Sequence, residues 1–396
     1  MKAVIVGGGV AGPAVGLALH RAGIEPVLLE RRSVADPEAG SYLTVCPNGL
    51  DALAAVDALD LAREVGFPSR LNTMYGATGR LLGEIPLGRP LVDDLVALTM
   101  KRSRLAVVLA DEADRRGVDV RRGAHVVHVS GGADGVTATL ADGTTVSGEV
   151  LVGADGVHSL VRRTVDPNAP SGRYVGLTNF GGITRSTRLA EQLAPEAWHF
   201  VFGSRAFFGA HQTPDGDVVW FLNVPRPEIS ADERRTTSKE QWQHWLHELV
   251  RDDAGPAAAL VSGGELELAG DNTFDLPSVP TWSRDGMVVI GDAAHAPAPS
   301  SGQGASMALE DAVVLAQALR DGSDVSAGLA AYEQARRSRV EKIVAAGARS
   351  SSSKIPGRIG RRLQEPMLKL VFRHLVTEKS TEWMSGHRID WEAPVG

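Results

Sequence analysis

The sequence predicts an α/β fold in which a parallel sheet is interleaved with an antiparallel sheet and followed by C-terminal helices. Two observations predict the parallel part. A glycine-rich turn follows a short apolar segment near the N-terminus, and two later apolar segments end in turns that contain Asp155-Gly156 and Gly291-Asp292. A third observation predicts the antiparallel part, because residues 171–285 contain aromatic-bearing, strand-like segments and a hairpin signal.

Composition limits the class of protein. The chain has 396 residues, so one large domain or two interlocked domains are expected. Hydrophobic residues make up 43% and charged residues 22%, as in ordinary globular proteins. The net charge of −7 provides no basic surface for nucleic acid. Cys46 is the only cysteine, so an intramolecular disulfide is impossible and a cytoplasmic location is expected.

The N-terminal segment resembles the apolar part of a signal peptide, because residues 3–19 are uncharged. The glycines within it make it a poor membrane helix, and no other segment is long enough to span a bilayer. We therefore expect neither a targeting segment nor a membrane span.

The first structural unit is predicted to be a βαβ unit. Residues 3–6 are apolar and β-branched, as in a buried parallel strand. Residues 10–22 are mostly small or apolar and suit a helix that ends at Gly23. A second strand is expected at residues 26–29 and leads into Glu30.

The glycine spacing Gly7-x-Gly9-x-x-Gly12 lies between this strand and helix, which is the context of a Rossmann-like dinucleotide site. Gly7 permits the tight turn, Gly9 lets the backbone approach a pyrophosphate, and Gly12 lets helix and strand pack closely. Glu30 lies 18 residues beyond Gly12, close to the roughly 20 expected for a carboxylate that accepts from a ribose hydroxyl. The alternative is a glycine-rich turn without a ligand. The neighbouring residues also expected to contact the cofactor are Val10, Ala11 and Arg31.

Two aspartates identify the expected dinucleotide. Asp155 and Asp292 each follow an apolar, strand-like segment, so both are expected at the carboxyl edge of the sheet, where ligands bind. Asp292 is placed there to accept hydrogen bonds from ribityl hydroxyls. A helix expected to open at about Ala305 would direct its positive end at the N1–C2=O edge of a flavin, and the glycines before it leave room for the ring. The predicted cofactor is FAD.

These motifs occur in the order of a known family. The glycine fingerprint, Asp155-Gly156-x-x-Ser159-x-x-Arg162 and Gly291-Asp292 together resemble the single-component flavoprotein aromatic hydroxylases, of which the p-hydroxybenzoate hydroxylase-like monooxygenases are familiar members. The resemblance covers essentially the whole chain, including Met384-Ser385-Gly386-His387 and Ile389-Asp390-Trp391. In one departure, Ala296 stands where the family often has proline after the histidine of the Gly-Asp motif. Only the local loop shape is expected to differ.

The resemblance also implies roles for single residues. Asp155 lies in a motif that serves both FAD and NAD(P)H, and Asp292 contacts the ribityl chain. Arg102 matches the arginine that opens the family's FAD-contacting helix; the alternative is an exposed charge at a helix N-terminus. No second Gly-x-Gly-x-x-Gly lies between a strand and a helix, so NAD(P)H is expected to bind transiently. The other residues expected to bind FAD near the second aspartate are Gly291, Pro299, Gly302, Gln303, Gly304 and Ala305.

The middle of the chain is expected to supply the substrate pocket, as the corresponding sheet does in the family. Strand-like segments are expected at residues 173–184, 198–202, 206–213 and 218–224. His211 ranks first as a substrate contact, because it is polar within an aromatic strand. The other candidates are Phe180, Phe200, Phe202, Phe208, Trp220, His199, Gln212 and Asn223. For each, the alternative is an ordinary core position. No catalytic base and no metal site are predicted.

The expected domain division has three parts. Residues 1–170 form the first part of the FAD-binding domain, with a substrate-domain insertion at about 70–100. Residues 171–285 form the substrate domain, and residues 286–396 complete the FAD-binding domain and add helices at 304–321 and 326–347. The segment 357–374 is basic and amphipathic. Packing on the FAD-binding domain is favoured over a membrane-surface or dimer contact.

The functional hypothesis is a monooxygenase. As the resemblance implies, FAD, NAD(P)H and O₂ would hydroxylate or epoxidise an aromatic or polycyclic small molecule through a flavin C4a-hydroperoxide. The protein would orient the substrate and exclude water, while the cofactor supplies the chemistry. The alternatives are another FAD-dependent reaction, such as that of an oxidase, halogenase or polyene reductase, and a non-catalytic flavoprotein that sequesters a metabolite. A monomer or a homodimer is expected, and the choice between NADH and NADPH is open.

Overall fold

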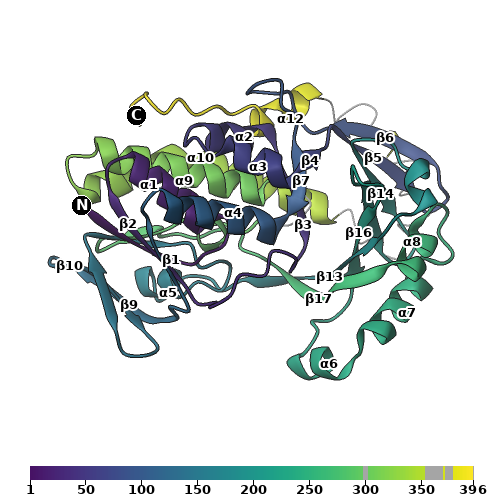
Figure 1. The fold of residues 1–396 in the computed structure, drawn as a ribbon, viewed down its shortest axis with the longest axis horizontal. Coiled ribbons are helices and arrows are strands. Elements are labelled where there is room, and N and C mark those ends of the chain that lie inside the picture. Colours follow the sequence, from purple (N-terminus) through teal and green to yellow (C-terminus); the bar gives the residue numbers. More distant parts are fainter. Residues whose placement is uncertain (298–301, 353–368, 371–377, 396) are drawn as a thin grey trace.

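A computed structural model describes the chain except for residues 298–301, 353–368, 371–377 and 396. Figure 1 shows two lobes side by side. The first contains the N-terminus and a sheet with long helices, and the second contains a large sheet with shorter helices on its outer side. The long strands β13 (Arg173–Thr184) and β17 (Glu265–Asp275) run from one lobe into the other.

The first lobe is built on a six-stranded sheet with the order β18-β19-β12-β1-β2-β8. The pairs from β19 to β8 are parallel, and β18 joins the edge in the antiparallel direction. The central strands are apolar because both of their faces are covered. This arrangement confirms the predicted Rossmann-like fold. The strands are β1 (Lys2–Val6), β2 (Glu25–Glu30), β8 (Asp119–Arg122), β12 (Val150–Gly153), β18 (Ser283–Arg284) and β19 (Met287–Val289).

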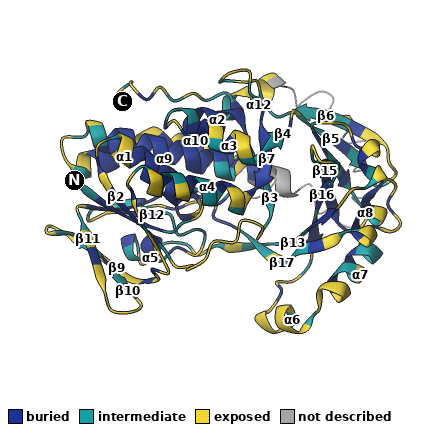
Figure 2. Cartoon of the chain, in the orientation of Figure 1, coloured by how far each residue is buried: buried dark blue, intermediate teal, exposed yellow. Residues whose placement is uncertain are grey.

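Helices form a buried layer on one face of this sheet, and a small sheet β11-β10-β9 with α5 covers the other face. Helix α9 packs between α1 and α10, and Figure 2 shows α1 and α9 as largely buried. Residues 11–19 and 306–319 are buried without interruption. The elements are α1 (Ala11–Arg21), α4 (Arg102–Arg115), α5 (Leu160–Val165), α9 (Gly304–Asp321), α10 (Val325–Ser352), β9 (Val126–Gly132), β10 (Gly135–Leu140) and β11 (Thr145–Gly148).

The second lobe is built on a seven-stranded sheet with the order β17-β13-β16-β15-β14-β5-β6. Every neighbouring pair is antiparallel except β14 with β5, which is parallel. This pairing brings an early segment of the chain into the predicted antiparallel sheet. Helices α7 and α8 pack on its outer face. The elements are β5 (Leu71–Gly76), β6 (Leu81–Pro86), β14 (Ala197–Phe202), β15 (Phe207–Gln212), β16 (Val218–Pro225), α6 (Ala231–Thr236), α7 (Lys239–Val250) and α8 (Ala257–Gly263).

A small sheet with the order β3-β7-β4 lies between the lobes, next to helices α2 and α3. Helix α2 begins at Pro47, a favoured first helical residue because its fixed φ suits the first turn. Helix α2 packs on α9 and so connects this region with the core. The elements are β3 (Tyr42–Val45), β4 (Phe67–Pro68), β7 (Leu98–Lys101), α2 (Pro47–Ala54) and α3 (Leu59–Val65).

The C-terminal region returns over the first lobe. Helix α10 continues through Ser352, beyond the predicted residues 326–347, because serine is tolerated in helices. The basic segment 357–374 lies outside the described residues, apart from residues 369–370. Helix α12 (Glu378–Ser385) and the chain after it run across α2 toward the end of the first lobe (Figure 1).

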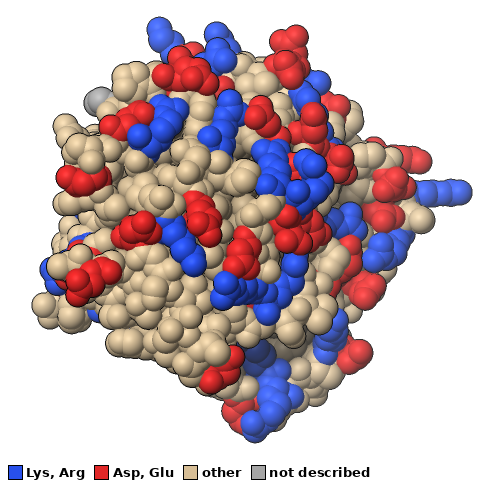
Figure 3. Space-filling model, turned by 60° about the vertical axis from the view of Figure 1, so that its left-hand side comes forward, with Lys and Arg blue, Asp and Glu red and all other residues tan. Residues whose placement is uncertain are grey.

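The surface carries charges of both signs. Figure 3 shows acidic and basic side chains interspersed over one face of the molecule, without a large area of a single sign. That face therefore lacks the continuous basic surface of a nucleic-acid-binding protein. In the part of the chain that the structure describes, none of the helices is both long and apolar enough to cross a membrane.

Candidate active site

A cavity of about 2100 Å³ is lined by residues of both lobes. Ligand pockets usually measure roughly 300–1,000 Å³, so this cavity has room for an extended cofactor and a second molecule. Its walls come from the turn after β1, the ends of β2 and β12, the start of α9 and the inner face of the seven-stranded sheet.

The turn after β1 forms one end of the cavity, where Gly7, Gly9, Val10 and Ala11 are lining residues. A Cβ atom at Gly7 would lie 2.4 Å from the carbonyl oxygen of Ala154, so this position admits no side chain. A Cβ atom at Gly9 would meet nothing within 4 Å and would extend into open space. Packing therefore does not require glycine at position 9, whereas the close approach of a ligand to the backbone does.

Two of the expected cofactor residues lie behind the cavity wall. Gly12 is buried, and a Cβ atom there would lie 1.8 Å from the carbonyl oxygen of Gly7. Gly291 is also buried, with φ +55°, and a Cβ atom there would lie 3.1 Å from Cβ of Ala308 on α9. Both glycines therefore set the spacing between helices and turns and leave ligand contact to their neighbours.

Glu30 ends β2 and lines the cavity beside Arg31. Its Oε2 atom accepts from the backbone N–H of Gly8 at 2.7 Å, and its Oε1 atom accepts from the backbone N–H of Arg32 at 2.9 Å. These bonds hold the carboxylate at the carboxyl edge of the sheet, where a ribose hydroxyl binds in dinucleotide folds.

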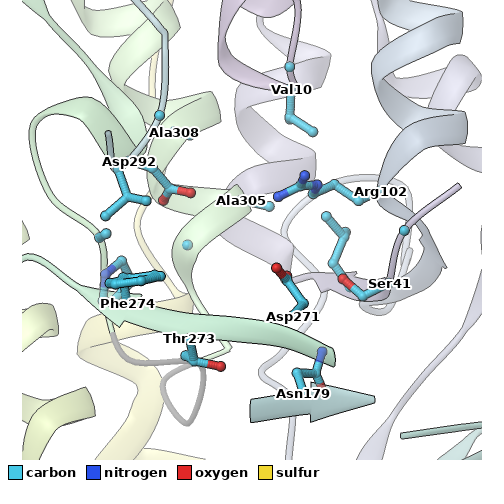
Figure 4. A pocket seen from close by; sticks show the side chains of 18 of the residues that line it. Val10, Ser41, Arg102, Asn179, Asp271, Thr273, Phe274, Asp292, Ala305 and Ala308 are labelled. Carbon is cyan, nitrogen blue, oxygen red and sulfur yellow. The ribbon is translucent and has the colours of Figure 1, made fainter. Parts of the chain in front are cut away.

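Arg102 and Asp292 occupy opposite walls at the centre of the cavity. Arg102 begins helix α4, and Asp292 lies in a short turn of 3₁₀-helix, η2 (Gly291–Ala293), after β19. Figure 4 shows both side chains pointing into the cavity. Burial raises the pKa of Asp292, and the positive charge of Arg102 opposes this shift. The fold thus brings two expected cofactor residues from distant segments to one site.

Helix α9 begins beside Asp292. Residues 302–305 line the cavity, and a Cβ atom at Gly304 would lie 4.0 Å from Oδ1 of Asp292. A helix N-terminus offers free N–H groups and a partial positive charge, which suit an electron-rich ring edge. Pro299, also expected to contact the cofactor, lies outside the described residues.

Asp155 follows β12 and lines the cavity next to the first glycine turn. Its Oδ2 atom accepts from the backbone N–H groups of Leu160 at 2.7 Å and Val161 at 3.2 Å. Burial raises the pKa of Asp155, and hydrogen bonds from Ser159 and these N–H groups oppose the shift. The Oδ1 atom is buried and has no partner among the described residues, so a bound molecule would satisfy it.

The second lobe contributes an aromatic wall to the cavity. Trp198 stacks on Phe200 with ring centroids 5.6 Å apart, and Phe221 meets Trp198 edge-on at 5.5 Å. Gly209 makes room for this cluster, because a Cβ atom there would lie 2.4 Å from the Phe221 ring. Such a surface suits a flat, apolar ligand. The aromatic wall consists of the lining residues Trp198, Phe200, Phe202, Phe207 and Phe221.

Three aromatic residues that the sequence nominated for substrate contact belong to the core on the other side of this sheet. Phe180 and Phe208 do not line the cavity. Trp220 is a lining residue, but its ring is buried in the same core and its N–H donates to Thr184 at 3.0 Å. Phe180 packs against Trp242 of α7 with centroids 5.2 Å apart. Successive side chains of a strand alternate between the two faces of the sheet. The aromatic wall is therefore formed by residues on the face opposite to this core.

His211 lies on the cavity side but beneath Trp198, whose ring meets it edge-on at 5.3 Å. Its Nδ1 atom is 2.7 Å from the carbonyl oxygen of Gln212, and its Nε2 atom is 2.9 Å from Oγ of Ser69. Because a carbonyl only accepts, Nδ1 carries the proton and Ser69 donates to Nε2. Burial lowers the pKa of His211 to about 4. This neutral histidine supports the wall and does not line the cavity.

A series of hydrogen-bonded hydroxyl groups connects His211 with the cavity. Oγ1 of Thr99 is 2.7 Å from Oγ of Ser69 and 2.8 Å from Oγ1 of Thr44, which is a lining residue. The indole N–H of Trp198 donates to both threonines at 3.1 Å. These bonds fix the plane of the tryptophan. Sequence reasoning missed both threonines, because single threonines on separate strands have no diagnostic spacing.

Helix α12 closes another part of the cavity. Trp383 and Met384 are lining residues, and the Arg339 guanidinium donates to their carbonyl oxygens at 2.8 and 2.6 Å. Arg339 also donates to the buried carboxylate of Glu310 on α9. The C-terminal segment named in the family resemblance is thereby attached to the core beside the cavity.

These features fit FAD. Open space at Gly9 suits a pyrophosphate, Glu30 suits a ribose, and Asp292 with the start of α9 suits the ribityl chain and the flavin ring. Among the described residues, no group of His, Cys, Asp and Glu could hold a metal ion. The fold and the cavity together define a flavin-dependent oxidoreductase with a Rossmann-like cofactor lobe and a separate substrate sheet.

Comparisons with known proteins agree with this class. A family model described as FAD binding domain matches residues 1–347, so the chain belongs to this family. The chain is 30% identical over 350 residues to the FAD-dependent urate hydroxylase of Klebsiella pneumoniae, covering 87% of this chain and 88% of that one. It is 32% identical to the 2-heptyl-3-hydroxy-4(1H)-quinolone synthase of Pseudomonas aeruginosa, covering 91% and 90%.

A solved structure gives the same result. The Klebsiella pneumoniae HpxO protein complexed with FAD and uric acid superposes with a TM-score of 0.82 and 25% identity, covering 93% of this chain and 92% of that one. The family resemblance predicted from the sequence motifs is therefore confirmed. The protein is an FAD-dependent monooxygenase of the aromatic hydroxylase type, with NAD(P)H as co-substrate.

Proposed function

We propose that this monooxygenase hydroxylates or epoxidises an aromatic or polycyclic ring that lies between the flavin and the aromatic wall. The observation that carries the proposal is that the aromatic wall shares one cavity with Arg102, Asp292 and the start of α9. A ring on the wall would face the flavin across a space bounded by both lobes.

In this proposal, four parts of the first lobe hold FAD. The turn at Gly9 receives the pyrophosphate, and Glu30 accepts from the adenosine ribose. Asp292 accepts from the ribityl hydroxyls, with Arg102 on the opposite wall. Residues 302–305 face the pyrimidine edge of the flavin. All of these positions line the same cavity, which supports their assignment to one extended cofactor.

When bound and reduced by NAD(P)H, FAD activates O₂ and supplies the oxygen atom that is transferred to the ring. The chain's own groups bind the substrate, orient it and exclude water. The aromatic wall offers an apolar surface, and the hydrogen bonds that the indole N–H of Trp198 donates to Thr44 and Thr99 fix the orientation of that ring. Excluding water favours oxygen transfer over unproductive loss of the oxidant. No side chain is required as a nucleophile.

The test is an anaerobic titration of the purified holoenzyme with NADH and NADPH, in the presence of phenols, indoles and polycyclic aromatics. We expect one compound class to accelerate bleaching of the flavin. After ¹⁸O₂ is admitted, one ¹⁸O atom should appear in the product by mass spectrometry. A bound flavin that neither nicotinamide reduces would instead support an oxidase or a sequestering flavoprotein.

We also propose that the protein works in a reducing compartment such as the cytoplasm. Cys46, its only cysteine, is buried and free, and burial raises the pKa of its thiol to about 12. No disulfide is therefore needed for the fold. Separation of a cell lysate into cytoplasmic and membrane fractions, followed by detection of the native protein, tests this location.

A further inference from the structure

A row of polar side chains crosses the inner face of the seven-stranded sheet. Asp271 on β17 pairs with Asn179 on β13, and Asn179 pairs with Asn223 on β16. Asn223 pairs in turn with Phe207 on β15, which pairs with Phe202 on β14. All five residues line the cavity. The first three, called the amide row here, therefore continue directly into the aromatic wall.

The two asparagines of the amide row are only partly satisfied by each other. Nδ2 of Asn223 donates to Oδ1 of Asn179 at 3.1 Å. Within the described chain, neither Nδ2 of Asn179 nor Oδ1 of Asn223 is bonded to another protein group. The pair therefore offers one free donor group and one free acceptor from adjacent strands. If the N and O atoms of both amides were exchanged, the pair would still offer one free donor group and one free acceptor.

Charge on this sheet disfavours an anionic ligand. Among the described lining residues of the seven-stranded sheet there is no Lys, Arg or His, but Glu267 and Asp271 are present. Glu267 is paired with Nζ of Lys101 at 2.9 Å, whereas Asp271 has no cationic partner in the described ranges. Figure 4 shows Asp271 and Asn179 on the cavity wall that lies across from Arg102. An aromatic carboxylate would meet a like charge there.

We propose that the amide row recognises a planar, neutral substrate through a lactam edge, in which a ring N–H adjoins a ring carbonyl. The ring N–H donates to Oδ1 of Asn223, the carbonyl accepts from Nδ2 of Asn179, and the rest of the ring lies on the aromatic wall. This inference rests on the proposed function, because it names the substrate class of the same site. A phenol has no carbonyl acceptor, and a carboxylate has acceptors only.

Discrimination follows from the cost of unpaired polar groups. A site that hydrogen-bonds a polar edge rejects an analogue without that edge, because its own buried groups then lose their partners. Asn223 lines the cavity, and a ring bound on the aromatic wall would exclude the water that could replace a missing ligand group. The amide row should therefore select the lactam edge, and the aromatic wall should select ring size.

The test measures binding to the holoenzyme by perturbation of the flavin absorbance. The probes are 1(2H)-isoquinolinone, its N-methyl derivative and 2-naphthoate. We expect the lactam to bind about tenfold more tightly than either analogue. Asn223→Leu and Asn179→Leu should each weaken lactam binding about tenfold. Asn223→Leu should change binding of the N-methyl lactam by less than about twofold, whereas Asn179→Leu should weaken it as well, because that derivative keeps the carbonyl that accepts from Asn179. Asn179→Asp, which keeps the side-chain shape, serves as a second variant if leucine disturbs the fold. Asn168→Asp, at an exposed loop position, is the control and should match the wild type.

Three results would overturn the inference: tighter binding of 2-naphthoate than of the lactam, equal losses for both lactams in Asn223→Leu, or no binding of the lactam. Failure of the proposed function is separate, since binding is measured without turnover. Lactam binding that depends on the amide row, without any O₂-dependent product from any bound compound, would contradict the proposed function alone. Oxygenation of 2-naphthoate without a lactam preference would contradict the inference alone.

Discussion

The Nε2 atom of His295 lies 2.5 Å from Oδ2 of Asp311, which ties the Gly-Asp turn after β19 to helix α9. The same oxygen accepts from the backbone N–H of Gly291 at 3.0 Å, and Oδ1 accepts from Arg336 at 2.8 Å. Burial opposes ionisation, but His295 and Arg336 outweigh it and hold the pKa of Asp311 below its usual range. Asp311 thereby holds Gly291 in place and so positions Asp292, which directly follows Gly291 in the turn.

Asp311→Asn should therefore weaken both the fold and FAD binding. Removing the charge of Asp311 from this buried ionic cluster leaves Arg336 and Arg339 sharing the carboxylate of Glu310, and we expect the free energy of unfolding to fall by about 3–5 kcal/mol. We also expect the affinity for FAD to fall at least tenfold. Urea unfolding and FAD titration measure the two effects. Asp252→Asn, which breaks the exposed pair with Arg205, should change stability by less than about 1 kcal/mol. Wild-type stability of Asp311→Asn would contradict this role.

Two glycine substitutions separate ligand contact from packing. Gly9→Val should leave the apoprotein folded, because a side chain there enters open space, but should lower FAD affinity at least tenfold by occupying the pyrophosphate position. Gly12→Ala should instead destabilise the fold, because its Cβ atom would lie 1.8 Å from the carbonyl oxygen of Gly7. Thermal unfolding of both apoproteins and fluorescence titration with FAD distinguish the effects. Normal FAD affinity in Gly9→Val would show that the cofactor binds elsewhere.

The two faces of the substrate sheet should respond differently to the same substitution. Phe221→Leu removes part of the aromatic wall and should raise KM for the aromatic substrate several-fold. Phe180 lies in the core under α7. The substitution Phe180→Leu should therefore lower the free energy of unfolding by about 1 kcal/mol and have little effect on KM. Steady-state kinetics and denaturant unfolding are measured on both variants. A larger KM effect in Phe180→Leu would reverse the assignment of the faces.

His211 predicts a pH dependence of stability. Its pKa is lowered by burial from 6.5 to about 4 in the folded protein, so the folded state takes up the proton less readily than the unfolded chain. The contribution of neutral His211 to the free energy of unfolding is complete above pH 6.5. As the pH falls from 6.5 toward 4, the free energy of unfolding decreases by about 3 kcal/mol for this reason. His211→Gln should flatten this part of the stability–pH curve, measured by urea unfolding. His199→Gln provides a comparison, because burial lowers the pKa of His199 to about 4 as well. Identical curves for wild type and His211→Gln would exclude the contribution.

The cofactor lobe could be anticipated in detail because its signals are local. Gly7 has a φ of +110°, a side chain at Gly12 would collide with Gly7 in the same strand–turn–helix unit, and Asp292 comes shortly after the segment that forms β19. The substrate sheet could be anticipated only as a sheet. Alternation along β13 implies that Phe180 and Asn179 face opposite ways, but it does not indicate which of them faces the flavin.

By itself, the sequence determined the α/β class, the dinucleotide turn and the Gly-Asp turn, because glycine spacing and apolar strand ends act over a few neighbouring residues. Only the tertiary structure decided that Thr44, Thr99 and Ser69 connect His211 with the cavity, since these residues come from separate segments. It likewise decided that Asp271, Asn179 and Asn223 form one row. The reason is physical: strand register depends on how whole faces are buried, and no single strand carries that information.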